Sequence, residues 1–92
     1  MHYLVIEHFR GRDPVPVYRR LRDQGRRMPE GLRYVSSWIT HDLTRCYQVM
    51  ETADPGLLDE WMGHWSDLME FEVLPVLSSA QVQEMVSPRL GP

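Results

Sequence analysis

Few residues of this chain have the chemistry of a ligand site, and those that do lie on segments with the pattern of β-strands. Glu7 interrupts the apolar run near the start of the chain, and Gln48 interrupts a second such run. Binding sites for small molecules are mostly apolar with a few placed polar groups. We therefore predict a ligand site that joins these two polar residues to aromatic residues on similar strands: Tyr3, Glu7, Tyr34, Trp38 and Gln48. The sequence assigns no catalytic residue.

Glu7 is the residue of this predicted site that is able to transfer a proton. A carboxylate on an otherwise apolar sheet face is costly unless it is paired or functional, and burial raises its pKa towards the range of a general base. Glu7 is therefore either a base in a pocket or a structural residue, paired with Arg33 or Arg45 or exposed at a strand end. The two arginines flank a predicted turn, where they either clamp an anionic ligand or remain solvated. Cys46 is either a nucleophile or a small buried hydrophobe.

The four histidines do not have the spacing of a metal site. His2 and His8 share a strand parity, but the strand between them separates them by about 20 Å. His41 falls in a predicted turn and His64 in a predicted helix, and no segment has a zinc-ligand pattern such as Cys-x-x-Cys. Because the chain has no lysine, Schiff-base and Walker lysines are excluded. We expect neither a metal nor a cofactor.

An Asp-Pro pair occurs twice and marks the start of two predicted helices. Asp suits the N-cap of a helix and Pro its first turn, so Asp13-Pro14 and Asp54-Pro55 should each begin an amphipathic helix. The first helix has its own apolar stripe at Val17, Tyr18, Leu21 and Met28, and it is expected to continue to a stop at Pro29. The second has an apolar stripe at helical spacing, which we assign to the core: Leu58, Trp61, Met62, Trp65 and Leu68.

Strand-like runs lie before, between and after these helices, and we predict strands over residues 3–9, 32–40, 45–52 and 71–77. Pro75 inside the last run indicates an edge strand or a bulge, because proline cannot donate a ladder hydrogen bond. A short helix over 79–86 and a frayed tail complete the expected organisation. We describe it as one domain over residues 1–80, followed by a short helix or flexible tail over 81–92.

The order strand, helix, strand, strand, helix, strand is the split motif of ferredoxin-like α+β proteins. It predicts a four-stranded antiparallel sheet with both helices on one face and the other face open. We assign four residues to the side of the helices: Leu4, Ile6, Val35 and Ile39. The open face should then carry Tyr3, Val5, Glu7, Tyr34, Ser36 and Trp38. The pattern of the third strand fits two arrangements nearly equally well. In one, Tyr47 and Val49 face the helices, and in the other Cys46, Gln48 and Met50 do.

Composition is that of an ordinary globular domain, with 42% hydrophobic and 25% charged residues. The net charge of −3 argues against a nucleic-acid partner. No apolar run approaches the roughly 18 residues of a membrane span, and the first residues lack the pattern of a signal peptide. We expect a cytoplasmic protein with neither nucleic-acid nor membrane partners. An open face this apolar is instead expected to meet a second copy, which gives a homodimer.

Three stretches carry a family resemblance: YLVIEHF, DPVPVYRRLRDQGRRMPEGLRYVSSW and LTRCYQVMETADPGLLDEWMGHWSDLMEFEVLPV. In this order they resemble a small bacterial family of unknown function, over roughly residues 2–80. That family is similar to the dimeric α+β barrel proteins, whose protomer is ferredoxin-like. The resemblance therefore implies a dimeric barrel. It implies no catalytic residues, because the wider superfamily contains oxygenases, isomerases, peroxidases and stress-response dimers.

Three interpretations of function remain open at this point. The first is a homodimer that binds a small apolar or aromatic metabolite in a cavity against the sheet. The second is a cofactor-independent enzyme of the monooxygenase or isomerase type, with Glu7 or a pocket histidine as base and Trp38 orienting the substrate. The third is an interaction module whose open face serves only dimerisation. Whether the protein is an enzyme is left undecided by the sequence.

Overall fold

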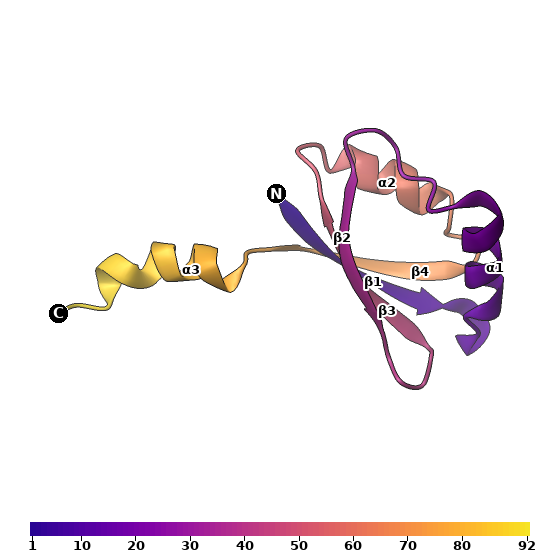
Figure 1. The fold of residues 1–92 in the computed structure, drawn as a ribbon, viewed down its shortest axis with the longest axis horizontal. Coiled ribbons are helices and arrows are strands. Elements are labelled where there is room, and N and C mark those ends of the chain that lie inside the picture. Colours follow the sequence, from indigo (N-terminus) through magenta and orange to yellow (C-terminus); the bar gives the residue numbers. More distant parts are fainter.

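A computed structural model, which describes all 92 residues, has one four-stranded antiparallel sheet with two helices against one of its faces (Figure 1). The strands are β1 (His2–Phe9), β2 (Arg33–Ile39), β3 (Arg45–Glu51) and β4 (Met69–Val76). The helices are α1 (Val15–Gln24), α2 (Gly56–Gly63) and α3 (Ser79–Val86), with 3-10 turns at Arg10–Arg12 and Ser87–Arg89. The predicted α+β class and antiparallel sheet are confirmed.

The spatial order of the strands is β2-β3-β1-β4, so that the N-terminal strand lies in the middle of the sheet. β4 lies at an edge, which is one of the two alternatives that Pro75 indicated, and Pro75 is opposite Tyr3 of β1. Proline is tolerated there because an edge strand leaves one of its two sides without ladder hydrogen bonds.

Both Asp-Pro pairs begin a helix, as predicted, although the regular helix starts just after the proline. The Asp13 carboxylate accepts a hydrogen bond from the Val15 amide at 3.0 Å, and the Asp54 carboxylate accepts one from the Gly56 amide at 2.9 Å. These bonds satisfy backbone donors that have no partner inside the helix. The Asp side chains therefore bond to the start of each helix, although the N-cap positions predicted for them are occupied by Pro14 and Pro55.

Both helices end earlier than the sequence pattern indicates. The predicted extension of α1 to Pro29 is wrong, because Gly25 adopts φ +70° and turns the chain out of the helix after Gln24. α2 ends at Gly63, and Trp65 lies in the following turn while remaining buried. The apolar stripe therefore identified core residues correctly but overestimated the length of the helix.

The sheet presents opposite surfaces that we name the helix-covered face and the open face. The helix-covered face carries Val5, Glu7, Cys46, Gln48 and Met50, which are all buried. The open face carries the alternate residues of the same strands together with their neighbours on β2 and β4: Leu4, Ile6, Trp38, Tyr47, Val49 and Leu74.

The predicted facing of β1 is therefore wrong. Val5 and Glu7 lie beneath the helices, whereas Leu4 and Ile6 belong to the open face. This strand is apolar on both parities, so its pattern alone gives no preference. On β3 the alternative parity is the correct one, since Tyr47 lies on the open face opposite Trp38.

On β2 a bulge changes the facing partway along the strand. The pairing with β3 shifts between Tyr34 and Ser36, so that Tyr34 and Ser37 lie on the same side, with their hydroxyls 2.7 Å apart. The predicted open position of Tyr34 and the inward position of Val35 are therefore wrong. Beyond the bulge Ile39 lines the helix side, as expected. A bulge adds one residue to one strand and so inverts the alternation.

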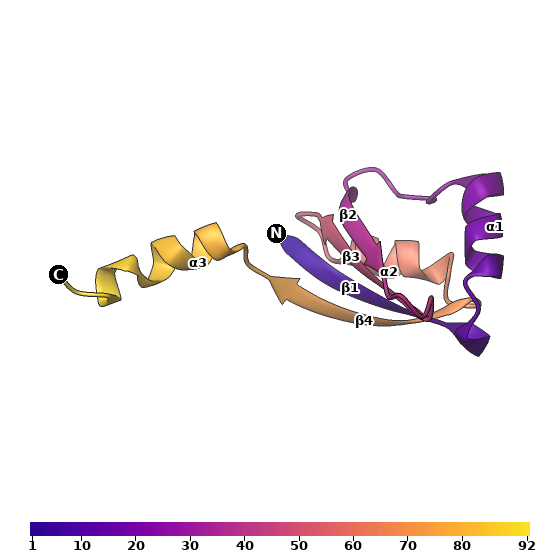
Figure 2. The same ribbon diagram turned by 60° about the horizontal axis from the view of Figure 1, so that its bottom comes forward.

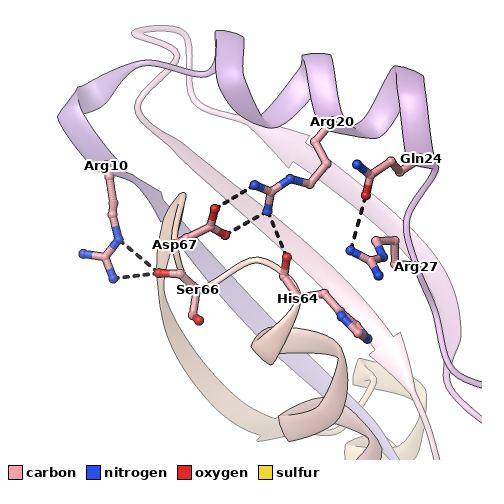
Figure 3. A network of polar contacts seen from close by, with 7 residues as sticks. All are labelled: Arg10, Arg20, Gln24, Arg27, His64, Ser66 and Asp67. Carbon is pink, nitrogen blue, oxygen red and sulfur yellow. Dashed lines mark hydrogen bonds and ion pairs between the residues drawn. The ribbon is translucent and has the colours of Figure 1, made fainter.

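A polar network on the surface fixes α1 against the turn that leads into β4 (Figure 3). The Arg20 guanidinium contacts the Asp67 carboxylate at 2.6 and 2.8 Å and also donates to the His64 carbonyl at 2.9 Å. Arg10 donates two hydrogen bonds to the Ser66 carbonyl, at 2.9 and 3.1 Å. These contacts join α1 and the 3-10 turn at Arg10–Arg12 to the segment between α2 and β4.

The last residues form an arm that projects away from the sheet and from α1 and α2 (Figures 1 and 2). This C-terminal arm, residues 77–92, contains α3, whose start is fixed by a capping box between Ser78 and Gln81. Nearly all of its side chains are exposed, among them the apolar Val82 and Met85. None of the helices is both long enough and apolar enough to cross a membrane.

Candidate functional site

A cavity of about 80 Å³ lies between the helix-covered face and the two helices. Nine of its 13 lining residues are hydrophobic, which is the composition of small-molecule sites. The apolar wall consists of Phe9, Val17, Leu21, Ile39, Trp61, Trp65 and Met69, with Tyr18 beside it. The ninth hydrophobic residue is Cys46, and the polar lining consists of Glu7, Arg26, Ser37 and Gln48. The cavity is large enough to hold several water molecules or a small ligand.

The sheet register brings the polar groups of the cavity together. Glu7 on β1 lies directly opposite Cys46 on β3, and Gln48 lies opposite Val5 on the same pair of strands. Ser37 on β2 is in turn opposite Gln48. Because alternate residues of a strand share a face, these side chains point to the same side as one patch.

Glu7 is 5% exposed and has no cationic group within ion-pair distance. Burial raises the pKa of its carboxyl from the ordinary 4.5 to about 7, and the Cys46 thiol and the Arg26 guanidinium oppose that rise only partly. Burial has this effect because it disfavours the charged form. Near neutral pH, Glu7 is therefore able both to accept and to donate a proton.

Cys46 is buried next to Glu7, and burial together with that carboxyl raises the pKa of its thiol far above the ordinary range. The thiolate is the nucleophilic form of cysteine. The structure thus favours the buried hydrophobe over the nucleophile among the two interpretations of Cys46.

Gln48 is almost fully buried, and its amide nitrogen contacts the Met50 sulfur at 3.2 Å. A thioether is a weak acceptor. The amide oxygen therefore remains available to a ligand in the cavity.

The five predicted site residues separate into three groups. Glu7 and Gln48 line the cavity, while Tyr34 lies next to it with its ring under the Arg26 guanidinium. Tyr3 packs against the core without lining the cavity. Trp38 is on the open face, 65% exposed, so that it has no access to Glu7.

Arg26 and Ser37 are lining residues that the sequence did not indicate as part of a site. Arg26 lies in the loop after α1, where no periodicity relates a side chain to the sheet. Ser37 is brought inward by the bulge of β2. Tyr18 and Leu21 were identifiable as members of the apolar stripe of α1, although not as cavity residues.

The arginines proposed as partners of Glu7 are elsewhere. Arg33, at the start of β2, forms an ion pair with Glu51 at 2.7 Å. Glu51 is the last residue of β3, whereas Cys46, which lies opposite Glu7, is near the start of that strand. Arg45 has no ion pair with any carboxylate and lines a separate surface hollow with His8. The predicted ion pair of Glu7 with either arginine is therefore wrong. No group of three or more His, Cys, Asp or Glu residues is placed to hold a metal ion.

The fold and the cavity define a small α+β protein with a buried carboxyl in an apolar chamber. The chain belongs to the family described as a domain of unknown function, DUF3303, whose model matches residues 1–90. Comparison with curated proteins and with solved structures gives no match.

Proposed function

We propose that this protein binds a small molecule with an apolar body in the cavity, with the Glu7 carboxyl as its principal polar partner. The observation that carries the proposal is the burial of Glu7 in an apolar chamber without an ionic partner. A carboxyl in such a place lowers the stability of the protein unless a ligand or a reaction uses it. Gln48 and Ser37 supply further hydrogen-bonding groups on the same wall.

Tryptophan fluorescence offers a direct test, because two of the three tryptophans line the cavity. A Trp38→Phe background removes the exposed third one and leaves emission from Trp61 and Trp65. We expect phenol to change this emission saturably and Glu7→Gln to raise its Kd at least tenfold, about 1.4 kcal/mol. Glu60→Gln, an exposed carboxylate on α2, is the matched control and should leave the Kd unchanged. Equal affinities in wild type and Glu7→Gln, or no response at all, would contradict the proposal.

A second candidate is a cofactor-independent enzyme of the isomerase type, and the observation that favours it is the burial of Glu7 in the cavity wall, which raises the pKa of its carboxyl to about 7. A base with this pKa takes a proton from one carbon of a substrate and returns it to another near neutral pH. Glu7→Gln should then abolish turnover while a substrate analogue still binds. Saturable binding by the wild type without any turnover would favour a simple binding protein.

We further propose that two copies pack through their open faces as a dimeric α+β barrel of ferredoxin-like protomers. The strand order β2-β3-β1-β4 with both helices on one face supports this architecture. The open face leaves large apolar side chains in water, with Trp38 65% and Leu74 50% exposed. Such a patch is typical of an interaction surface.

The C-terminal arm supports a second copy as the occupant of this surface. Leu74 and Val76 on the open face of β4 lead directly into Leu77 and the exposed Val82 and Met85. An isolated helix of this length is marginal in water, so the arm needs a surface to pack on. A second copy that covers the end of β4 meets the arm as a continuation of the same apolar strip.

Native mass spectrometry and light scattering test the dimer. We expect wild-type protein to be dimeric at micromolar concentration and Trp38→Lys to be monomeric, because the substitution places a charge on the open face, where the two copies would meet. Leu43→Lys, at a similarly exposed position on the β2–β3 hairpin, should remain dimeric. A monomeric wild type would overturn the dimer. A dimer whose cavity binds no ligand would favour the interaction module.

A further inference from the structure

The Arg26 guanidinium is a cation that lines the cavity without a counter-ion. Its central carbon lies 3.8 Å from the centroid of the Tyr34 ring, whereas Arg10, Arg20, Arg22 and Arg33 are each paired with a carboxylate. No side chain of the protein forms an ion pair or a hydrogen bond with the Arg26 guanidinium, although the residue is part of the cavity wall.

The backbone of Arg26 is held in place by two tryptophans of the cavity wall. Its carbonyl accepts hydrogen bonds from the indole of Trp61 at 2.9 Å and from the indole of Trp65 at 3.1 Å. Gly25 before it and Arg27 after it both have positive φ, +70° and +59°. This loop conformation is sparsely populated for a residue other than glycine, and the two indoles stabilise it.

Stacking on Tyr34 also orients the guanidinium. A planar guanidinium stacked by its face keeps its N–H donors in the plane of the group, where they remain free to bind an acceptor. The donors form a fork that matches a carboxylate in a bidentate arrangement. Both the backbone and the side chain of Arg26 are thus held in advance of any ligand.

We propose that Arg26 binds the carboxylate of the cavity ligand, so that the ligand is a small monocarboxylic acid with an apolar body. One guanidinium matches one negative charge, and the apolar wall of Trp61, Trp65 and Leu21 matches the body of the acid. This inference rests on the proposed function, in which a polar group of the ligand contacts Glu7. It adds that the same ligand carries a carboxylate, which contacts Arg26.

Arg26 and Glu7 are complementary in this arrangement. They line the same cavity without forming an ion pair within 4 Å, which leaves room for a ligand group between them. A carboxylate on Arg26 favours the protonated form of Glu7, since a second negative charge nearby disfavours ionisation. Protonated Glu7 then donates a hydrogen bond to an acceptor on the ligand.

Benzoate and benzamide are suitable probes, because they have nearly the same shape and differ in charge. In the Trp38→Phe background, we expect benzoate to bind at least tenfold more tightly than benzamide. Arg26→Gln should raise the Kd of benzoate at least tenfold and leave that of benzamide unchanged. Arg26→Lys should give an intermediate Kd, because it retains the charge without the fork. The exposed neighbour variant Arg27→Gln should have no effect.

Several results would overturn this inference. Equal binding of the two probes to wild type, or an equal loss of both in Arg26→Gln, would show that charge is not recognised by Arg26. Binding of phenol or benzamide without a preference for benzoate would overturn the role of Arg26 and leave the cavity proposal standing. Failure of all three probes would overturn both. Thermal unfolding of each variant checks the fold, and the Arg26 carbonyl that holds the indoles is present in every variant.

Discussion

On the helix-covered face of the sheet Glu7 and Gln48 are buried, whereas on the open face Trp38 and Leu74 are exposed to solvent. The usual distribution places apolar groups inside and polar groups outside. Each face of this sheet departs from it in the opposite direction. Buried polar groups with spare bonding capacity fit a small ligand, and exposed apolar groups fit a protein surface. The two faces are therefore suited to two different kinds of partner.

Substitution of one tryptophan on each face tests the difference between the two faces most directly. Trp61 packs edge-on against Phe71, with 5.6 Å between ring centroids, and donates to the Arg26 carbonyl. We expect Trp61→Ala to lower the free energy of unfolding by about 3–5 kcal/mol, measured by urea denaturation. Trp38→Ala on the open face should cost no more than about 0.5 kcal/mol in dilute, monomeric protein. If the loss in free energy of unfolding caused by Trp38→Ala grows with protein concentration, the open face is covered by a second copy in a dimer.

The pH dependence of stability tests the buried carboxyl of the helix-covered face. The folded-state pKa of Glu7 is raised from 4.5 to about 7, so the folded protein binds more protons than the unfolded chain between these values. The free energy of unfolding should therefore fall as pH rises from 4.5 to 7, by up to about 3 kcal/mol. The other ionisable groups near Glu7 are the Arg26 guanidinium and the side chains of Cys46 and Tyr18, and burial raises the pKa of the Cys46 thiol and of the Tyr18 hydroxyl further above this range.

Urea unfolding at pH 5 and pH 8 measures this slope, and Glu7→Gln should remove most of it. Glu60→Gln, which removes an exposed carboxylate, should retain the wild-type slope. A slope that is unchanged in Glu7→Gln would mean that another group of the protein produces the pH dependence, and that Glu7 is not desolvated in solution.

The smallest expected effect concerns the C-terminal arm. The Ser78 hydroxyl accepts a hydrogen bond from the Gln81 amide at 3.1 Å, and Ser78→Ala should destabilise α3 by about 0.5–1 kcal/mol. Amide hydrogen exchange should increase within residues 79–86 only, with the global free energy of unfolding unchanged. If the arm packs on a second copy, the loss should also weaken dimerisation, which separates a packed arm from a free one.

Much of the local structure was predictable from the sequence because its causes are local. The carboxylates of Asp13 and Asp54 bond to backbone amides two residues ahead, and Pro75 restricts β4 to an edge. The start of α3 at Ser79 was predicted correctly. The early end of α1 was missed because Gly25 is followed by Met28, which continues the helical spacing of apolar residues although the chain has already turned.

Of the candidate site, the sequence identified Glu7 and Gln48 by their polarity within apolar runs. It placed Glu7 on the wrong face, left the facing of Gln48 open, and added Tyr3 and Trp38, which lie outside the cavity. Arg26 was not identified, because its loop reaches the cavity through the indoles of Trp61 and Trp65. Those contacts join residues that are far apart in the chain.

The sequence by itself determined which segments are strands and helices, because alternation, helical spacing and Asp-Pro starts act over a few residues. Only the tertiary structure decided which side of each strand is covered. On β1 the parity of Leu4 and Ile6 is as apolar as that of Val5 and Phe9, and on β2 a bulge inverts the alternation. The facing of Glu7 therefore follows from how the helices pack on the sheet as a whole, which no local pattern of residues contains.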